Sequence, residues 1–163
     1  MTKPQDVWVH GGEEVKAPFH YKGCGLDDIW LMNGYDVEKV EGEEVVSVRN
    51  LDGLWEAIAA YLVTRKKVLG GKEIRFLRTQ LNLTQSELAR LLGCDGQQVA
   101  RYEKGANRMP GPADRVLRML VREHYDGEVS ARDILNALDV LDGRVEERHV
   151  FSATPEGCWK AAA

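Results

Sequence analysis

The sequence predicts an α+β protein with a small N-terminal domain of strands and one helix, a larger helical domain, and a C-terminal helix followed by a β-hairpin. Three patterns predict this class. Short apolar runs alternate with turn residues over residues 29–48, apolar residues recur at helical three- and four-residue steps over residues 54–121, and short runs around a turn return after residue 148.

We expect four segments along the chain. Residues 1–20 combine proline, glycine and mixed charges without a sustained period, which predicts a flexible arm. Residues 21–69 should form the small α+β domain, residues 70–125 a domain of four to five helices, and residues 126–163 the C-terminal helix and hairpin. The pair Gly70-Gly71, after a basic stretch, marks the boundary between the two domains.

The small domain should contain three short strands, Ile29–Met32, Tyr35–Val40 and Val45–Val48. Asn33-Gly34 lies between the first two runs, and this dipeptide predicts a tight two-residue hairpin. A helix should follow, capped by Asn50 or Asp52. Its apolar residues recur at helical spacing: Leu54, Trp55, Ile58, Tyr61 and Leu62.

Local signals position the helices of the central domain. An amphipathic helix is predicted over Lys72–Leu81. Thr84 with Glu87 three residues later forms a capping box, so the next helix should begin at Gln85. We expect one apolar face on this helix, formed by Leu88, Leu91 and Leu92, and a left-handed glycine, Gly93, at its end.

Asp95 can cap a second short helix directly after that turn. Val99 and Tyr102 should point inward from it, while its polar residues stay outside. Another helix is predicted after Pro110-Gly111-Pro112. Near the C-terminus Ser130 can cap a helix that Gly143 closes, and runs at 149–152 and 157–160 should pair as a hairpin.

Charge is distributed unevenly along the chain. The formal net charge is −4, yet residues 64–122 hold 13 Lys and Arg against five acids, a balance of +8. The remaining residues therefore carry −12. A cationic module between acidic flanks predicts a polyanionic partner for the middle of the chain.

Residues 72–123 resemble the helix-turn-helix domain of the lambda-repressor and Cro family, also called the xenobiotic-response-element type. The family's small residue, turn glycine and inward aliphatic residue fall on Ala89, Gly93 and Val99. Residues 101–105, Arg-Tyr-Glu-Lys-Gly, are similar to the family's usual end of the recognition helix. The resemblance implies that this domain binds double-stranded DNA, with the second helix of the motif in the major groove.

The resemblance also implies site residues. Base readout falls on Gln97, Gln98 and Arg101, where glutamine suits adenine and arginine suits guanine. Gly96 departs from relatives that carry a longer polar residue, so one base contact is expected to be missing. Phosphate contacts are expected from Gln85, Arg75, Arg78, Arg90, Lys104 and Arg108. For any one of these cations, an ordinary solvated helix surface is an equally good interpretation.

These implications predict a transcriptional repressor that binds a pseudo-palindromic operator as a homodimer, in the cytoplasm at the nucleoid. The order of a small domain before the helix-turn-helix is similar to MqsA/HigA-type antitoxins, and the acidic flanks would suit a basic toxin. Relatives of the MqsA type bind zinc through paired Cys-x-x-Cys motifs, which this sequence lacks. We therefore expect no metal and no cofactor. A stand-alone regulator without a toxin, or a protein-interaction module, are the alternatives.

Other function classes find less support in the sequence. The histidines, Asp27-Asp28 and Ser47 show no spacing that would assemble a nucleophile, base and orienting acid, so no enzyme is expected. No apolar run approaches the roughly 20 residues of a membrane span. Three dispersed cysteines indicate reduced thiols. Trp30, Trp55 and Trp159 are expected in the core, or at a dimer surface.

Overall fold

The computed structural model describes residues 7–9, 13–15, 18–128, 130–141 and 148–162. The chain divides into two compact units, residues 1–58 with 146–163, and residues 59–145. The architecture is α+β, with N-terminal strands, helices in the middle and a C-terminal hairpin, as the sequence predicts.

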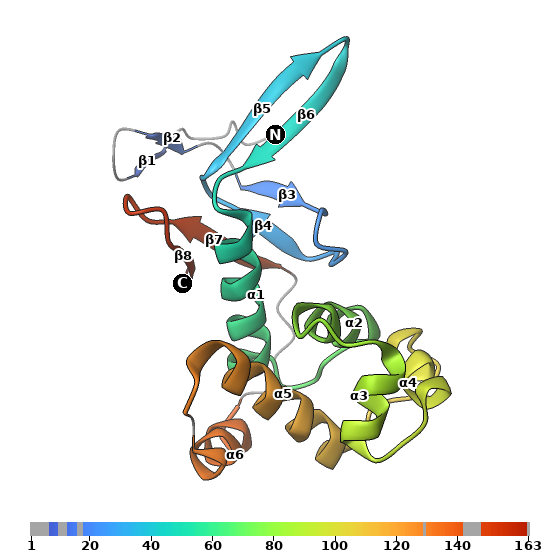
Figure 1. Cartoon of the computed structure of the whole chain (residues 1–163). Helices are drawn as coiled ribbons and strands as arrows, with labels where there is room; N and C mark the ends of the chain where they lie inside the picture. Colours follow the sequence, from blue (N-terminus) through green and yellow to red (C-terminus); the bar gives the residue numbers. More distant parts are fainter. Residues whose placement is uncertain (1–6, 10–12, 16–17, 129, 142–147, 163) are drawn as a thin grey trace. The chain divides into compact units, whose positions relative to one another are not determined.

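A four-stranded sheet forms the centre of the first unit (Figure 1). Its strands, in spatial order, are β3 (Phe19–Tyr21), β4 (Ile29–Leu31), β7 (His149–Ala153) and β8 (Trp159–Ala161). β4 pairs antiparallel with β3 and parallel with β7, and β7 and β8 form the predicted C-terminal hairpin. Chain segments more than 100 residues apart are thus neighbours in one sheet.

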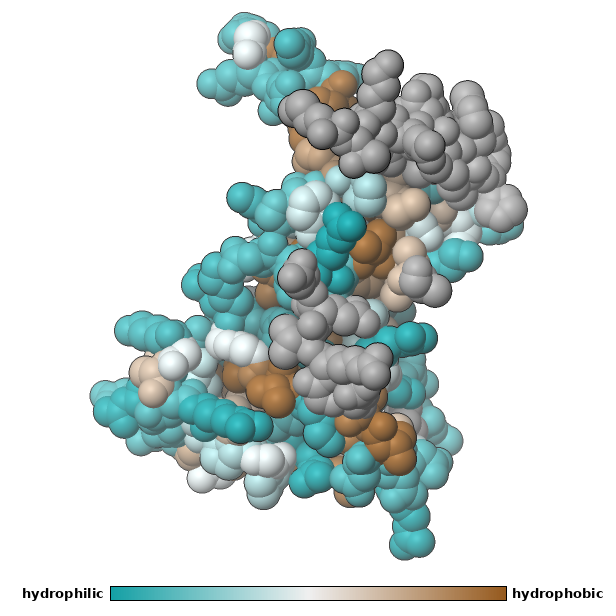
Figure 2. Space-filling model, turned by 180° about the vertical axis from the view of Figure 1, so that it is seen from behind, coloured by the Kyte–Doolittle hydropathy of each residue, from teal (hydrophilic) through white to brown (hydrophobic). Residues whose placement is uncertain are grey.

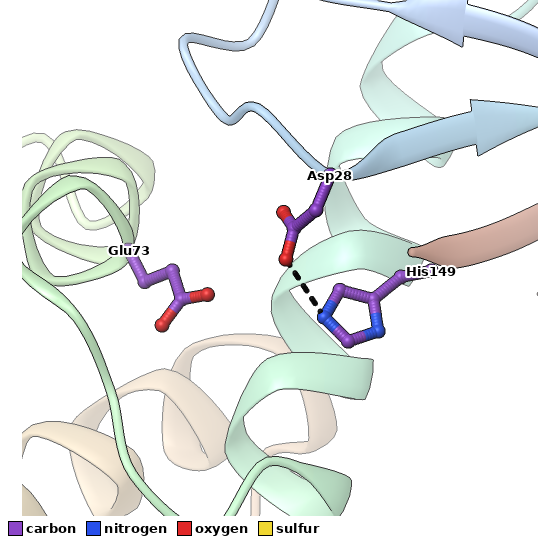
Figure 3. A group of neighbouring side chains, drawn as sticks. All are labelled: Asp28, Glu73 and His149. Atoms are coloured by element: carbon purple, nitrogen blue, oxygen red, sulfur yellow. Dashed lines mark ion pairs between the residues drawn. The ribbon is translucent and has the colours of Figure 1, made fainter. Parts of the chain in front are cut away.

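The core of this unit follows the period of the strands. Ile29, Leu31 and Phe151 are fully buried, and Trp159 is 8% exposed. At the N-terminal end of β7, His149 is buried as well, and its Nε2 lies 3.0 Å from an Asp28 carboxylate oxygen. The side chains of Asp28 and His149 point toward each other in Figure 3. This close approach of the two side chains and the hydrogen bond from the His149 main-chain N–H to the Asp28 carbonyl join the starts of β4 and β7.

Asn33-Gly34 does not form the predicted hairpin. The Asn33 side-chain amide instead makes two hydrogen bonds with the main chain of Ala153. Its oxygen accepts the Ala153 N–H at 2.7 Å, and its nitrogen donates to the Ala153 carbonyl at 3.1 Å. Gly34 has φ of +76°, and a Cβ there would lie 2.6 Å from the Trp159 ring. The dipeptide therefore extends the β4–β7 contact and then turns the chain away, which requires glycine.

The hairpin of this region forms one step later. β5 (Tyr35–Val40) pairs antiparallel with β6 (Glu43–Val48), and the two strands pair with no other described strand. Its turn residues, Glu41 and Gly42, have φ of +52° and +90°, as a two-residue turn of the mirror-image type requires. Two further strands, β1 (Val7–Val9) and β2 (Glu13–Val15), and β3 lie partly in the region where only an irregular arm was expected.

Helix α1 (Leu51–Arg65) begins after Asn50, whose side-chain oxygen accepts the Gly53 N–H, so Asn50 rather than Asp52 supplies the cap. In the second unit, the end of α1 is held by Arg118, a fully buried arginine. Arg118 donates to the carbonyls of Leu62, Val63, Lys66 and Lys67 and pairs with Asp114 at 2.7 Å. It thereby satisfies carbonyls that a helix end leaves without partners.

The second unit continues with five helices (Figure 1). They are α2 (Gly71–Gln80), α3 (Gln85–Leu92), α4 (Gly96–Glu103), α5 (Gly111–Asp126) and α6 (Ala131–Asp139). Buried residues from α2 to α5 enclose one core: Ile74, Leu77, Leu88, Ala89, Val99, Tyr102, Leu117 and Val121. Ser130 caps α6 as predicted. α6 ends at Asp139, however, and Gly143 lies outside the described residues.

On the face drawn in Figure 2, several hydrophobic patches lie among hydrophilic residues. In the described part of the chain, every helix falls short of the length and hydropathy that crossing a membrane requires.

Candidate nucleic-acid interface

Helix α3 begins at the predicted capping box. The Thr84 hydroxyl accepts the Glu87 N–H at 3.1 Å, and a Glu87 carboxylate oxygen accepts the Thr84 N–H at 2.7 Å. Hydrogen bonding of the Glu87 carboxylate to the main-chain N–H of Thr84, and secondly to the Thr84 side chain, holds the pKa of Glu87 below its usual value because it favours the charged form. Gly93, with φ of +75°, ends the helix in the left-handed conformation. Both ends of α3 are therefore encoded locally.

Helix α4 begins one residue after its cap. An Asp95 carboxylate oxygen accepts the Gln98 N–H at 2.8 Å, so Asp95 is the N-cap, as predicted. Val99 and Tyr102 are buried, and these inward residues fix which side of α4 faces out. Gln97 and Arg101, four residues apart, are exposed on that outer side, and Gln98 is half-buried. The side chains of all three make no hydrogen bond or ion pair with the described residues.

Glu103, the last residue of α4, joins three elements of the domain. Its side chain is 5% exposed and pairs with Arg78 of α2, Nε to Oε1 at 2.5 Å. The other carboxylate oxygen accepts from Gln85 Nε2 at 2.8 Å, at the start of α3. Arg78 also donates to the Leu83 carbonyl at 2.7 Å. This network sets the position of α4 against α2 and α3, and no local pattern in the sequence singles out Glu103.

Arg78 is therefore unlike the other cations assigned to phosphate contacts. Its side chain is only 12% exposed and its donors are occupied by Glu103 and Leu83. The remaining four are exposed and form no ion pair with any described residue: Arg75 on α2, Arg90 on α3, Lys104 at the end of α4, and Arg108 after it. Exposed cations without an acidic partner remain available to phosphate.

A shallow hollow of about 510 Å³ lies where the N-termini of α3 and α4 meet. It brings two predicted site residues together, Gln85 and Gln97. Its other lining residues are Ser86, Asp95, Gly96 and Ala100. The hollow places the start of α3 beside the outer side of α4, which is the arrangement that a helix-turn-helix presents to a major groove.

One part of the sequence interpretation fails on α3. Leu91 is 50% exposed and does not contribute to the apolar face, while Leu88 and Ala89 are buried there. The helix is only eight residues long, so its inward side accommodates few side chains. Leu91 follows Arg90 on the exposed side instead.

Comparison with known proteins supports the assignment of this region. Residues 74–114, about a quarter of the chain, match the helix-turn-helix family. No curated protein and no solved structure matches the chain. The matched segment runs from α2 into the first turn of α5 and contains the Glu103 network and the hollow. Residues 74–114 are thus a helix-turn-helix domain of the lambda-repressor and Cro type, and this domain indicates DNA binding.

Proposed function

We propose that the chain is a sequence-specific transcriptional repressor that reads operator DNA through α4. The observation that carries this proposal is the outer side of α4, where Gln97 and Arg101 are exposed and make no hydrogen bond or ion pair with the described residues. Amide and guanidinium groups four residues apart on a helix reach neighbouring base edges, and each makes bidentate contacts. Arg90, Lys104 and Arg108 supply phosphate contacts beside them.

Selection from a library of random duplexes tests sequence-specific recognition. The full chain should enrich a short motif, and a second half-site in inverted orientation should follow one helical turn away. Recovery of unenriched sequences after repeated rounds would contradict the proposal. Enrichment of a single half-site without an inverted copy would support sequence-specific DNA binding and contradict the proposed dimer.

The homodimer has a candidate surface on α5. Val116, Met119 and Leu120 are half-exposed and line a groove between α5 and α6, whereas Leu117 and Val121 of the same helix are buried. A second copy that covers this stripe would remove apolar area from water. Sedimentation equilibrium should show concentration-dependent dimers of the wild type, and Met119→Glu should shift the protein to monomer. A wild type that sediments as a monomer at all concentrations would exclude the proposed homodimer.

A second candidate function is neutralisation of a basic toxin, which the β5–β6 hairpin favours. Residues 35–48 hold five acids and one lysine, and residues 36–47 are exposed. Exposed valines lie among these charges: Val37, Val40, Val45 and Val46. A two-stranded hairpin without a covering layer is only marginally stable. A basic protein with an apolar strip would complement it in charge and hydrophobicity.

The test uses the purified product of the neighbouring gene as the probe in a calorimetric titration. An antitoxin should bind it, and the double variant Glu38→Lys/Glu43→Lys should lose binding while DNA affinity is unchanged. Equal binding by wild type and variant would exclude the hairpin as the contact. Absence of binding in both would favour a stand-alone regulator.

A further inference from the structure

The first turn of α3 contains an exposed serine that takes no part in capping this helix. Ser86 lies one residue after Gln85, and its hydroxyl makes no hydrogen bond with the described residues. A serine near a helix start often stabilises the helix, but Thr84 and Glu87 already form that capping box. The Ser86 hydroxyl therefore has both its donor and its acceptor capacity available.

Gly96 of α4 gives this hydroxyl its space. A Cβ atom at position 96 would lie 2.9 Å from Ser86 Oγ, closer than nonbonded atoms allow. The same Cβ would lie 3.5 Å from the Ser86 Cα and 3.6 Å from its nitrogen, both ordinary contacts. A Cβ atom at position 96 therefore competes with the serine hydroxyl and not with the backbone of α3.

The space that the two positions share opens into the hollow between the two helix starts. Gln97, the first residue of α4 assigned to base readout, lines the same hollow. A base edge that Gln97 contacts would therefore have Ser86 beside it. Gly96 has no side chain that could contact a base. The Ser86 hydroxyl of α3 lies beside the position that a side chain at residue 96 would occupy.

We propose that Ser86 is a specificity-determining residue, whose hydroxyl hydrogen-bonds a major-groove base edge next to the one that Gln97 reads. This inference rests on the proposed DNA-binding function. A serine hydroxyl donates or accepts, so it contacts either kind of base edge. One hydrogen bond of this kind changes the preference at one base pair by about 3- to 10-fold.

The experiment measures relative affinities for every single-base variant of the selected site, with the full chain. Ser86→Ala should lower the preference at one base pair by about 3- to 10-fold and leave the other positions unchanged. Gly96→Ala should affect the same base pair, because its methyl group displaces the hydroxyl. Ser47→Ala, the same chemical change on the exposed β6 strand, is the matched control and should change no position.

The outcomes separate this inference from the function on which it rests. Unaltered base preferences in Ser86→Ala would overturn the inference, while a wild type that still selects its motif keeps the proposed function. A uniform loss of affinity over all positions in Ser86→Ala would also overturn it, since that result indicates a structural role. Melting temperatures of both variants equal to or above that of the wild type ensure that the comparison concerns folded protein. A wild type without base preference would overturn the proposed function itself.

Discussion

Arg78 Nε lies 2.5 Å from Glu103 Oε1, and this pair connects α2 to the end of the helix that carries Gln97 and Arg101. Both side chains are largely buried, at 12% and 5% exposed. Gln85 joins the same carboxylate from α3. The surface proposed to read DNA is thus positioned against α2 and α3 by this largely buried network.

Removal of one partner should destabilise the helix-turn-helix domain. Arg78→Ala leaves the buried Glu103 carboxylate without its cation, so the free energy of unfolding should fall by about 3 kcal/mol. Arg75→Ala, on the same helix but exposed and without an ion pair to any described residue, should change the free energy of unfolding by less than about 0.5 kcal/mol. Urea denaturation followed by circular dichroism measures both. Equal stabilities of the two variants would show that the pair has no such role.

Loss of the readout side chains should weaken specific binding without loss of stability. Gln97→Ala and Arg101→Ala should each cost about 1 to 3 kcal/mol of binding free energy at the selected site. Arg132→Ala on α6 removes an exposed arginine that forms no ion pair with the described residues, and it serves as the control. Fluorescence anisotropy with a labelled duplex gives the affinities. A control variant as weak as Arg101→Ala would place the contact elsewhere.

The capping box of α3 should make stability depend on acid pH. The pKa of Glu87 is lowered in the fold by hydrogen bonds from Thr84, so its contribution is present at neutral pH, above the unfolded pKa. That contribution is lost as the pH falls from about 4.5 through the lower folded pKa. The melting temperature of the wild type should therefore drop more between pH 5 and pH 3 than that of Glu87→Gln. Parallel pH profiles of the two proteins would disprove the assignment.

Asn33 should be essential to the sheet of the first unit. Asn33→Ala removes both hydrogen bonds to Ala153 and leaves its half-buried N–H and carbonyl without these partners, at a cost of about 1 kcal/mol each. Hydrogen exchange at the Ala153 amide should become faster in this variant than in the wild type. Ser47→Ala, on the exposed hairpin, should leave that exchange rate unchanged. An unchanged exchange rate of the Ala153 amide in Asn33→Ala would mean that the two Asn33 hydrogen bonds do not stabilise β7.

Signals that act over a few residues are the ones that sequence reasoning identified correctly. Thr84 and Glu87, Gly93, and Asp95 fix the ends of α3 and α4 through contacts within five residues, so their roles are visible in the sequence. The resemblance of residues 72–123 to a helix-turn-helix was confirmed over residues 74–114. The exposed position of Arg101 follows from the buried Val99 and Tyr102 in the same helix.

The roles of residues whose partners lie far away in the chain could not be predicted from the sequence. Asn33 binds Ala153, 120 residues further along the chain, and a dipeptide rule for hairpins contains no information about that partner. Arg78 counts as one more cation in the sequence, because the carboxylate that occupies it lies 25 residues away. The space beside the Ser86 hydroxyl exists only because Gly96 of α4 packs against this residue in the fold.

The most direct test of the account is a titration of the full chain with two labelled duplexes, the selected site and a scrambled duplex of the same composition, at several salt concentrations. Sequence-specific recognition through α4 predicts at least about 10³-fold tighter binding of the selected site than of the scrambled duplex, with both affinities falling as salt rises. Arg101→Ala should reduce that ratio, while Lys104→Ala should weaken both duplexes alike and lower the salt slope by about one. Equal affinity of the wild type for both duplexes at every salt concentration would contradict the central claim.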